Sequence, residues 1–265
     1  MRQHSSLARL LASAALMSIL AAGLGGCQTT SDITGALAPK SEASAAAETP
    51  AEVYGERYRA NPKDADLALA YGQALRLTGQ RAQAAAVLEQ ASLAHPGNKQ
   101  LLAAYGRALA DNGNFQQAFD VLSRAHSPDN PDWRILSVQG TALDQLGRHD
   151  EARRYYESAL NIVPDEPSVL SNLGLSYVLS KDLPKAEQAL RRAYASTRAD
   201  ARVRQNLGLV VGLQGRFAEA ESIVRADLPP EEAAANVAYL KQMLTRKDAR
   251  NGAGTVPVAA LSRQD

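Results

Sequence analysis

The side chains that most often carry out chemistry are few in this sequence and stand far apart. The 265 residues include a single cysteine, Cys27, and four histidines. His95, His126 and His149 fall in separate stretches, and none is paired with a cysteine or a second histidine at a metal-binding spacing. Motifs of the His-Glu-x-x-His, Gly-x-Ser-x-Gly and phosphate-loop types are absent. We therefore expect no catalytic, metal-binding or cofactor-binding residue, and a protein that is not an enzyme.

Cys27 stands at the end of a segment with the features of an export signal. Arg2 and Arg9 give it a basic start, and the stretch from Leu10 to Leu24 is apolar. The residues Leu24-Gly25-Gly26-Cys27 resemble the bacterial lipobox, which implies cleavage before Cys27 and attachment of a lipid to its thiol. By the same resemblance, Gln28 implies the outer membrane, on its periplasmic face. An uncleaved transmembrane anchor is the alternative, although the apolar stretch is short for a span of about 20 residues.

The rest of the chain divides by composition. Residues 28–50 are small and polar with few large apolar groups, so they cannot bury enough surface to fold. We expect a lipoprotein signal peptide over 1–26, an acylated Cys27 and flexible tether over 27–50, a folded domain over 51–247 and a disordered tail over 248–265. The formal net charge is +1 and no basic patch is evident, which argues against nucleic acid as a partner.

Small residues recur every 34 positions through the folded part. One series is glycine, and two alanine series follow it by twelve and nineteen residues, the last interrupted only at Asp227. The series are Gly72, Gly106, Gly140, Gly174 and Gly208; Ala84, Ala118, Ala152, Ala186 and Ala220; and Ala91, Ala125, Ala159 and Ala193. This period resembles the tetratricopeptide (TPR) repeat, a helix–turn–helix unit. Glycine costs about 1 kcal/mol in a helix relative to alanine, so we expect these residues to lie where the two helices of a repeat cross closely.

The pattern predicts an all-α solenoid of five repeats, with a half-repeat before them and a capping helix after them. The half-repeat is expected over 51–60, the repeats over 65–96, 99–130, 133–164, 167–198 and 201–227, and the capping helix over 231–246. Apolar residues of the last helix recur at spacings of three and four, which suits a helix that covers the last repeat. Lys181 replaces the turn glycine of the fourth repeat, where Asp182 as N-cap and Pro184 compensate.

The first helices of TPR repeats line a concave groove at positions 2, 5, 6, 9, 12 and 13 of each unit. Repeats one to three place mostly polar residues there, namely Asp66, Gln73, Arg76, Gln100, Arg107, Asp111, Arg134, Thr141, Asp144 and Gln145. Repeats four and five predict a partner-binding groove made of Asn172, Leu175, Val178, Leu179, Arg202, Asn206, Leu209 and Leu213. An apolar strip beside amides that can bond a peptide backbone suits a helix or an extended segment. The alternative is that the capping helix or the tail fills this strip.

Four stretches of the C-terminal half carry a narrower resemblance. They are Leu170-Ser-Asn-Leu-Gly-Leu-Ser-Tyr177, Arg202-Val-Arg-Gln-Asn-Leu-Gly-Leu209, Leu213-Gln-Gly-Arg-Phe-Ala-Glu-Ala-Glu221 and Ala233-Ala-Ala-Asn-Val-Ala-Tyr-Leu-Lys-Gln-Met-Leu244. Together with the lipobox, they resemble the TadD-like TPR lipoproteins of Flp (tight adherence) pilus systems. The resemblance implies a pilotin-like assembly factor that binds another subunit of the secretion apparatus, with the secretin as the suspected partner.

Two other functions remain open at this point. One is a generic envelope lipoprotein adapter that acts on peptidoglycan enzymes or on the insertion of outer-membrane proteins. The other is an enzyme with TPR support, which is disfavoured because the array leaves no room for a catalytic domain.

Overall fold

The computed structural model describes residues 48–127 and 129–252. The chain divides between Thr49 and Pro50, and the elements below belong to the unit that begins at Pro50. Within the described ranges all regular elements are α-helices, and the only β contact there is an isolated bridge between Ser127 and Asn130. No helix in these ranges is both long and apolar enough to cross a bilayer. The predicted lipid site at Cys27 and residues 253–265 of the predicted tail lie outside the described residues.

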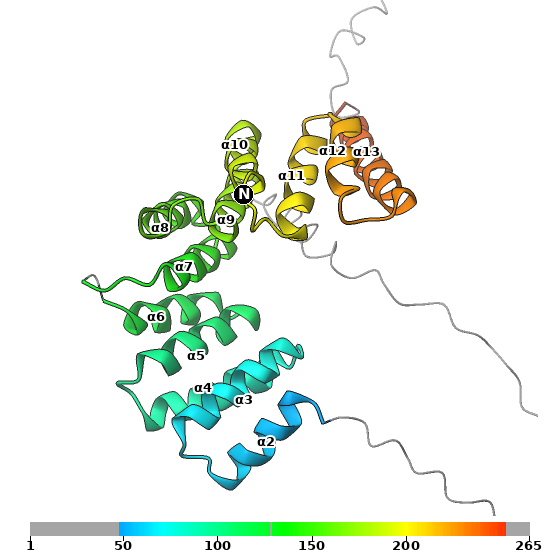
Figure 1. Cartoon of the computed structure of the whole chain (residues 1–265). Coiled ribbons are helices and arrows are strands. Elements are labelled where there is room, and N and C mark those ends of the chain that lie inside the picture. The colour runs from blue at the N-terminus through cyan, green and yellow to red at the C-terminus, as the bar shows by residue number, and fades with distance from the viewer. Residues whose placement is uncertain (1–47, 128, 253–265) are drawn as a thin grey trace, which may run out of the picture. The chain divides into compact units, whose positions relative to one another are not determined.

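The helices follow one another in the order that the period of 34 predicts (Figure 1). The half-repeat is α2 (Pro50–Ala60). The five repeats are the helix pairs α3 (Ala65–Leu77) and α4 (Arg81–Ala94), α5 (Lys99–Asp111) and α6 (Phe115–Ala125), α7 (Trp133–Gln145) and α8 (His149–Ile162), α9 (Pro167–Leu179) and α10 (Leu183–Tyr194), and α11 (Ala201–Leu213) and α12 (Phe217–Val224). The series ends with α13 (Pro230–Gly252). The predicted all-α solenoid of helix pairs is confirmed.

The first helix of each repeat begins at an N-cap position that also recurs every 34 residues. Asp64, Asn98, Asp132 and Asp200 are N-caps, and their side chains accept hydrogen bonds from backbone N–H groups of the first turn. These bonds satisfy N–H groups that have no partner within the helix. Glu166 holds the same position in the fourth repeat without a capping bond, and there the helix starts with a proline. This series of caps was not among the sequence predictions.

The glycine series lies where the two helices of a repeat cross, as predicted. A Cβ added at Gly106 would stand 2.5 Å from Cγ of Leu122 and 3.4 Å from the carbonyl oxygen of Ala118. A Cβ added at Gly140 would stand 2.6 Å from the ring of Tyr156. All five glycines face the residue sixteen positions later in this way. Each glycine therefore leaves room for a large buried side chain of the second helix.

The turns between the paired helices need a left-handed backbone. Gly79, Gly113, Gly147 and Gly215 have φ of 78°, 85°, 79° and 83°. Lys181 takes the same place in the fourth repeat with φ of 64°, a conformation that L side chains disfavour. Asp182 accepts a hydrogen bond from the backbone N–H of Lys185 and a proline lies in the first turn, as the sequence predicts.

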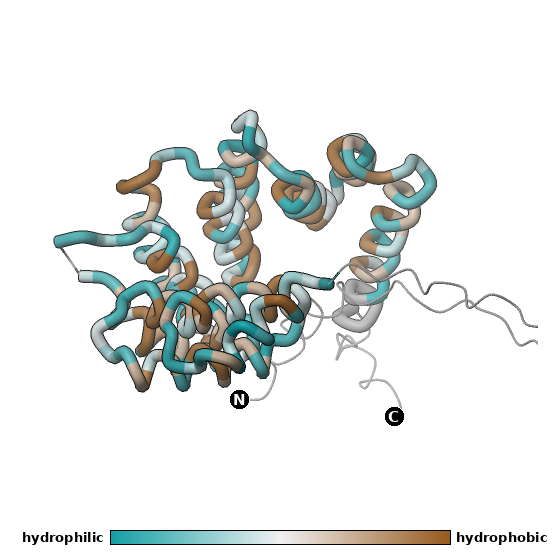
Figure 2. The backbone as a smooth tube through the Cα atoms, turned by 60° about the horizontal axis from the view of Figure 1, so that its bottom comes forward, coloured by the Kyte–Doolittle hydropathy of each residue, from teal (hydrophilic) through white to brown (hydrophobic). Residues whose placement is uncertain are grey.

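The capping helix α13 packs against α11 and α12. Ala233 is fully buried, Val237 joins the core cluster of Val210 and Val211, and Leu240 lies against Gly212. The prediction that this helix covers the last repeat is therefore confirmed. The helix continues to Gly252, past its predicted end at residue 246. Figure 2 shows hydrophobic and hydrophilic segments alternating along the helices, as expected for elements with one face in a core.

Asp227 interrupts the third small-residue series because it forms an ion pair. Its carboxylate accepts two hydrogen bonds from Arg204, from Nε and from Nη2, each 2.5 Å long. The side chains are 24% and 15% exposed for Arg204 and Asp227 respectively. In the preceding repeat the equivalent positions hold Leu170 and Ala193, which share an apolar cluster. The fifth repeat thus replaces an apolar contact with a charged one, and both substitutions occur together.

Candidate partner-binding groove

The predicted groove residues lie on α9 and α11, whose surfaces contact each other. Four leucines, Leu175, Leu179, Leu209 and Leu213, are neither fully buried nor fully exposed. We call these four residues the leucine strip. Val178 is only 5% exposed and packs in the core with Leu190 and Val210, so its side chain faces the interior.

The two predicted asparagines join neighbouring first helices. Nδ2 of Asn172 donates to Oγ of Ser137 at 3.1 Å, and Nδ2 of Asn206 donates to Oγ of Ser171 at 2.8 Å. The side-chain NH₂ groups of both amides are thus engaged between repeats. Arg202 is highly exposed at 80% and lies 3.3 Å from a carboxylate oxygen of Asp200.

With α13 in place the leucine strip stays partly exposed, although Leu213 packs against the same core cluster as Val237 of α13. This helix contacts α11 through Val237 and Leu240, the latter against Gly212. Leu209 and Leu213 on α11 remain partly exposed with α13 in place. An apolar surface that its own cap does not bury is typical of a site for another protein.

A buried carboxylate joins the third and fourth repeats. Asp144 was expected among the polar groove residues, but it is only 7% exposed. It accepts hydrogen bonds from Nδ1 of His149 at 2.8 Å, from the hydroxyl of Tyr156 at 2.9 Å and from Oγ of Ser176 at 2.8 Å. Burial raises the pKa of Asp144, and the three hydrogen bonds act in the opposite direction. The network ties α7, α8 and α9 together, which explains why a charge is tolerated there.

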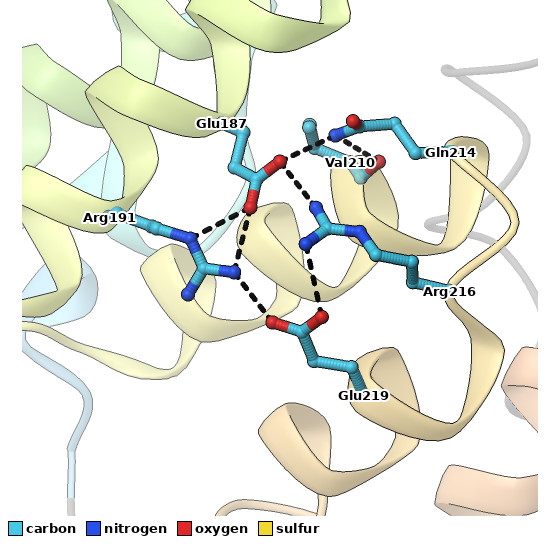
Figure 3. A network of polar contacts seen from close by, with 6 residues as sticks. All are labelled: Glu187, Arg191, Val210, Gln214, Arg216 and Glu219. Atoms are coloured by element: carbon cyan, nitrogen blue, oxygen red, sulfur yellow. Dashed lines mark hydrogen bonds and ion pairs between the residues drawn. The ribbon is translucent and has the colours of Figure 1, made fainter.

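A second polar network fastens the fourth repeat to the fifth (Figure 3). Glu187 on α10 accepts from Arg191 at 2.7 Å, from Gln214 at 2.8 Å and from Arg216. Glu219 on α12 accepts from Arg191 at 2.6 Å and from Arg216 at 3.1 Å. Chiefly through the bond from Arg216, these contacts lower the pKa of Glu187 to about 2. The two carboxylates and two guanidinium groups alternate, so each charge lies beside opposite charges.

The three histidines within the described residues have structural partners. Nε2 of His95 is 2.8 Å from the carbonyl oxygen of Lys63, Nε2 of His126 is 3.2 Å from Oε1 of Gln139, and His149 bonds Asp144. Within the described part of the chain no three His, Cys, Asp or Glu side chains are grouped as metal ligands would be.

Comparison with known proteins places the fold. Residues 134–199 match the family model described as tetratricopeptide repeat, and residues 46–125 match the model of anaphase-promoting complex, cyclosome, subunit 3. The sequence matches no curated protein.

Among the solved structures that are similar to the chain, two have TM-scores near 0.6. One is a chain in the crystal structure of the APC/C hetero-tetramer Cut9–Hcn1, at TM-score 0.60 and 19% identity, covering 74% of this chain and 39% of that chain. The other is a thermophilic TPR protein of Thermus thermophilus, at TM-score 0.59 and 20% identity, covering 68% of this chain and 100% of that chain. At these identities the likeness concerns the fold. The repeats and the matches together show that residues 50–252 have a TPR solenoid fold.

Proposed function

We propose that the chain is a lipid-anchored TPR scaffold of the bacterial outer membrane that helps to assemble a Flp (tight adherence) pilus secretion apparatus. It would bind another subunit of that apparatus, with the secretin as the expected partner. The leucine strip is the observation that carries the binding part of this proposal, because Leu209 and Leu213 stay partly exposed beside the capping helix. The sequence features around Cys27 and the resemblance of the C-terminal repeats support the anchor and the pilus system.

The strip suits an apolar face of a partner helix or extended segment. Its four leucines come from two adjacent first helices, and α9 and α11 contact each other directly. The hydrogen bond from Asn206 to Ser171 fixes the spacing of these two helices before a partner binds, and the bond from Asn172 to Ser137 holds α9 on α7. A site held in its binding geometry loses less conformational entropy on association.

A pulldown with the secretin tests the partner and the strip together. Leu209→Asp places a charge in the strip and should reduce capture at least tenfold, because an unpaired charge would be desolvated in the interface. The matched control is Leu93→Asp on α4, since Leu93 is 76% exposed and lies outside the strip. Equal capture by the wild type and Leu209→Asp would exclude the strip, and no capture by the wild type would exclude the secretin.

The anchor has its own tests. Mass spectrometry of the protein from its native host should find cleavage before Cys27 and a lipid on its thiol; an intact Met1 or an unmodified Cys27 would contradict the proposal. Deletion of residues 28–50 should impair assembly by shortening the reach of the repeats from the membrane, without changing secretin capture in solution.

A further inference from the structure

Arg107 on α5 is a half-buried cation with no hydrogen bond or ion pair to any residue that the structure describes. Other arginines on the repeats, including Arg76, Arg204 and Arg216, are paired with carboxylates. Burying a charge without a partner costs free energy. The position of Arg107 on a first helix therefore calls for an explanation that repeat packing does not supply.

Two further guanidinium groups act on Arg107 from the neighbouring first helices. Burial is the largest effect that lowers the pKa of Arg107, Asp132 opposes it, and the positive charges of Arg76 on α3 and Arg134 on α7 lower the pKa further. The first helices α3, α5 and α7 contact one another in turn, and the ion pair of Arg76 with Asp111 joins α3 to α5 on the helix that carries Arg107. The positive charges of Arg76 and Arg134 thus make the charged form of Arg107 less favourable.

The nearby carboxylates are already engaged. Asp111 pairs with Arg76 at 2.6 Å, and the side chain of Asp132 accepts from the backbone N–H of Arg134 at 2.8 Å as the N-cap of α7. The three arginines and these two aspartates together carry a net charge of +1. A ligand with one carboxylate would neutralise this charge, whereas a doubly charged phosphate group would exceed it.

An apolar surface adjoins these charges. A hollow of about 270 Å³ is lined by Gln73, Arg76 and Leu77 on α3. Leu77 is 89% exposed, the highest value among the exposed large hydrophobic residues of the described chain. A ligand that reaches Arg107 past Arg76 would thus have an apolar contact within the same site.

We propose that the face formed by α3, α5 and α7 binds a protein segment in which an Asp or Glu side chain lies beside an apolar residue. Arg107 binds the carboxylate, Arg134 and Arg76 flank it, and Leu77 packs against the apolar neighbour. The inference rests on the proposed role as a protein scaffold and assigns a partner chemistry to the half of the array outside the leucine strip. In the free protein the unpaired charge of Arg107 is destabilising, and the bound carboxylate would remove that penalty.

An array of immobilised ten-residue peptides tests this site with the full chain purified in detergent. One set carries leucine beside Asp or Glu, a second carries Asn or Gln in the same places, and a third carries phosphoserine. The wild type should retain the acidic set at least ten times better than the amide set, and Arg107→Gln should abolish that preference. Arg124→Gln, which changes an exposed arginine of α6, is the matched control and should keep it.

Thermal unfolding separates binding from a structural role. Because Arg107 is unpaired, Arg107→Gln should leave Tm unchanged or raise it while the acidic preference is lost. The inference is overturned if the wild type shows no acidic preference, if Arg107→Gln retains it, or if the phosphoserine set binds better than the acidic set. Leu209→Asp should keep the preference for acidic peptides. The leucine strip is therefore tested by secretin capture with Leu209→Asp, and the Arg107 site is tested by peptide binding with Arg107→Gln.

Discussion

Lys181 occupies a backbone conformation that the other four repeats give to glycine. Its φ of 64° compares with 78° to 85° at Gly79, Gly113, Gly147 and Gly215. For a residue with a Cβ this conformation costs about 1 kcal/mol or more. The N-cap Asp182 and the following proline keep the turn in place.

Replacing Lys181 with glycine should stabilise the protein. We expect Lys181→Gly to raise the free energy of unfolding by about 1 kcal/mol, because the strain at this turn is removed. Glycine also makes the unfolded chain more flexible, which offsets part of this gain. Urea denaturation followed by circular dichroism measures the change. Lys181→Ala is the control, because alanine keeps the Cβ and should leave the stability near that of the wild type. Equal stabilities of the glycine and alanine variants would show that the turn is not strained.

The exposure of single residues could not be predicted from the repeat period. The period placed Asp144 and Val178 at groove positions, yet both are buried. They stand at the same place, position 12, in consecutive repeats, whereas Arg76 at position 12 of the first repeat is partly exposed. Periodicity identifies equivalent positions, but the exposure of each depends on what the next repeat packs against it. In the case of Asp144 the deciding partner is Ser176, 32 residues away.

The first helices of four repeats start at a side-chain cap that a single substitution can remove. Asn98 accepts from the backbone N–H groups of Gln100 and Leu101 at 3.0 and 3.1 Å. Asn98→Ala should therefore lower the free energy of unfolding by about 1 kcal/mol. Asn114, the N-cap of α6, makes no capping bond with its side chain. Asn114→Ala should have a much smaller effect in the same denaturation experiment, and equal losses would exclude capping as the cause.

The link between α10 and α12 gives the protein a dependence on pH. The pKa of Glu187 is lowered to about 2 in the folded state, against an ordinary value of about 4.3. A lowered pKa stabilises the folded state above the unfolded pKa, and this contribution is lost as the pH falls from about 4.5 to about 2. Between pH 6 and pH 3 the wild type should thus lose more stability than Glu187→Gln.

Urea midpoints at these two pH values measure this difference. Glu157→Gln is the control, because Glu157 is exposed on α8 and has no ion pair with a described residue. The control should follow the wild type. Parallel curves for the wild type and Glu187→Gln would show that the network of Figure 3 does not contribute through ionised Glu187.

Element positions were largely predictable, because the period of 34 fixes the phase of helices and turns. Gly79, Gly113 and Gly147 mark the turns in the sequence, and each has the positive φ that this role requires. The ion pairs that join the helices were not predictable in the same way. The pair of Arg204 and Asp227 spans 23 residues, and its presence shows in the sequence only as an interrupted alanine series. Ion pairs replace apolar contacts without changing helix spacing, so the period can show an interruption but does not identify the partner.

At the scale of the whole array, α13 closes the last repeat. A chain that ends at Leu228 would expose Gly212 and the cluster of Val210 and Val211 to water. Repeat arrays gain stability from nearest neighbours, so this loss should act locally. Amide hydrogen exchange should become faster in α11 and α12 and stay nearly unchanged in α5 and α6. A uniform increase along all repeats would show instead that the array unfolds as one unit.

The glycine crossings have a consequence for how such a chain can be rearranged. Each glycine meets a side chain sixteen positions later, so this contact is complete within a single repeat and survives when a repeat is copied or moved. The bonds from Asn172 to Ser137 and from Asn206 to Ser171 recur at two junctions, but other contacts are particular to one: Asp144 with Ser176 joins the third repeat to the fourth, and Glu187 with Arg216 joins the fourth to the fifth. Exchanging the third and fifth repeats would thus keep every helix pair intact and mismatch the junctions. The contacts at the junctions between repeats, and not those within a repeat, therefore favour the native order of the repeats.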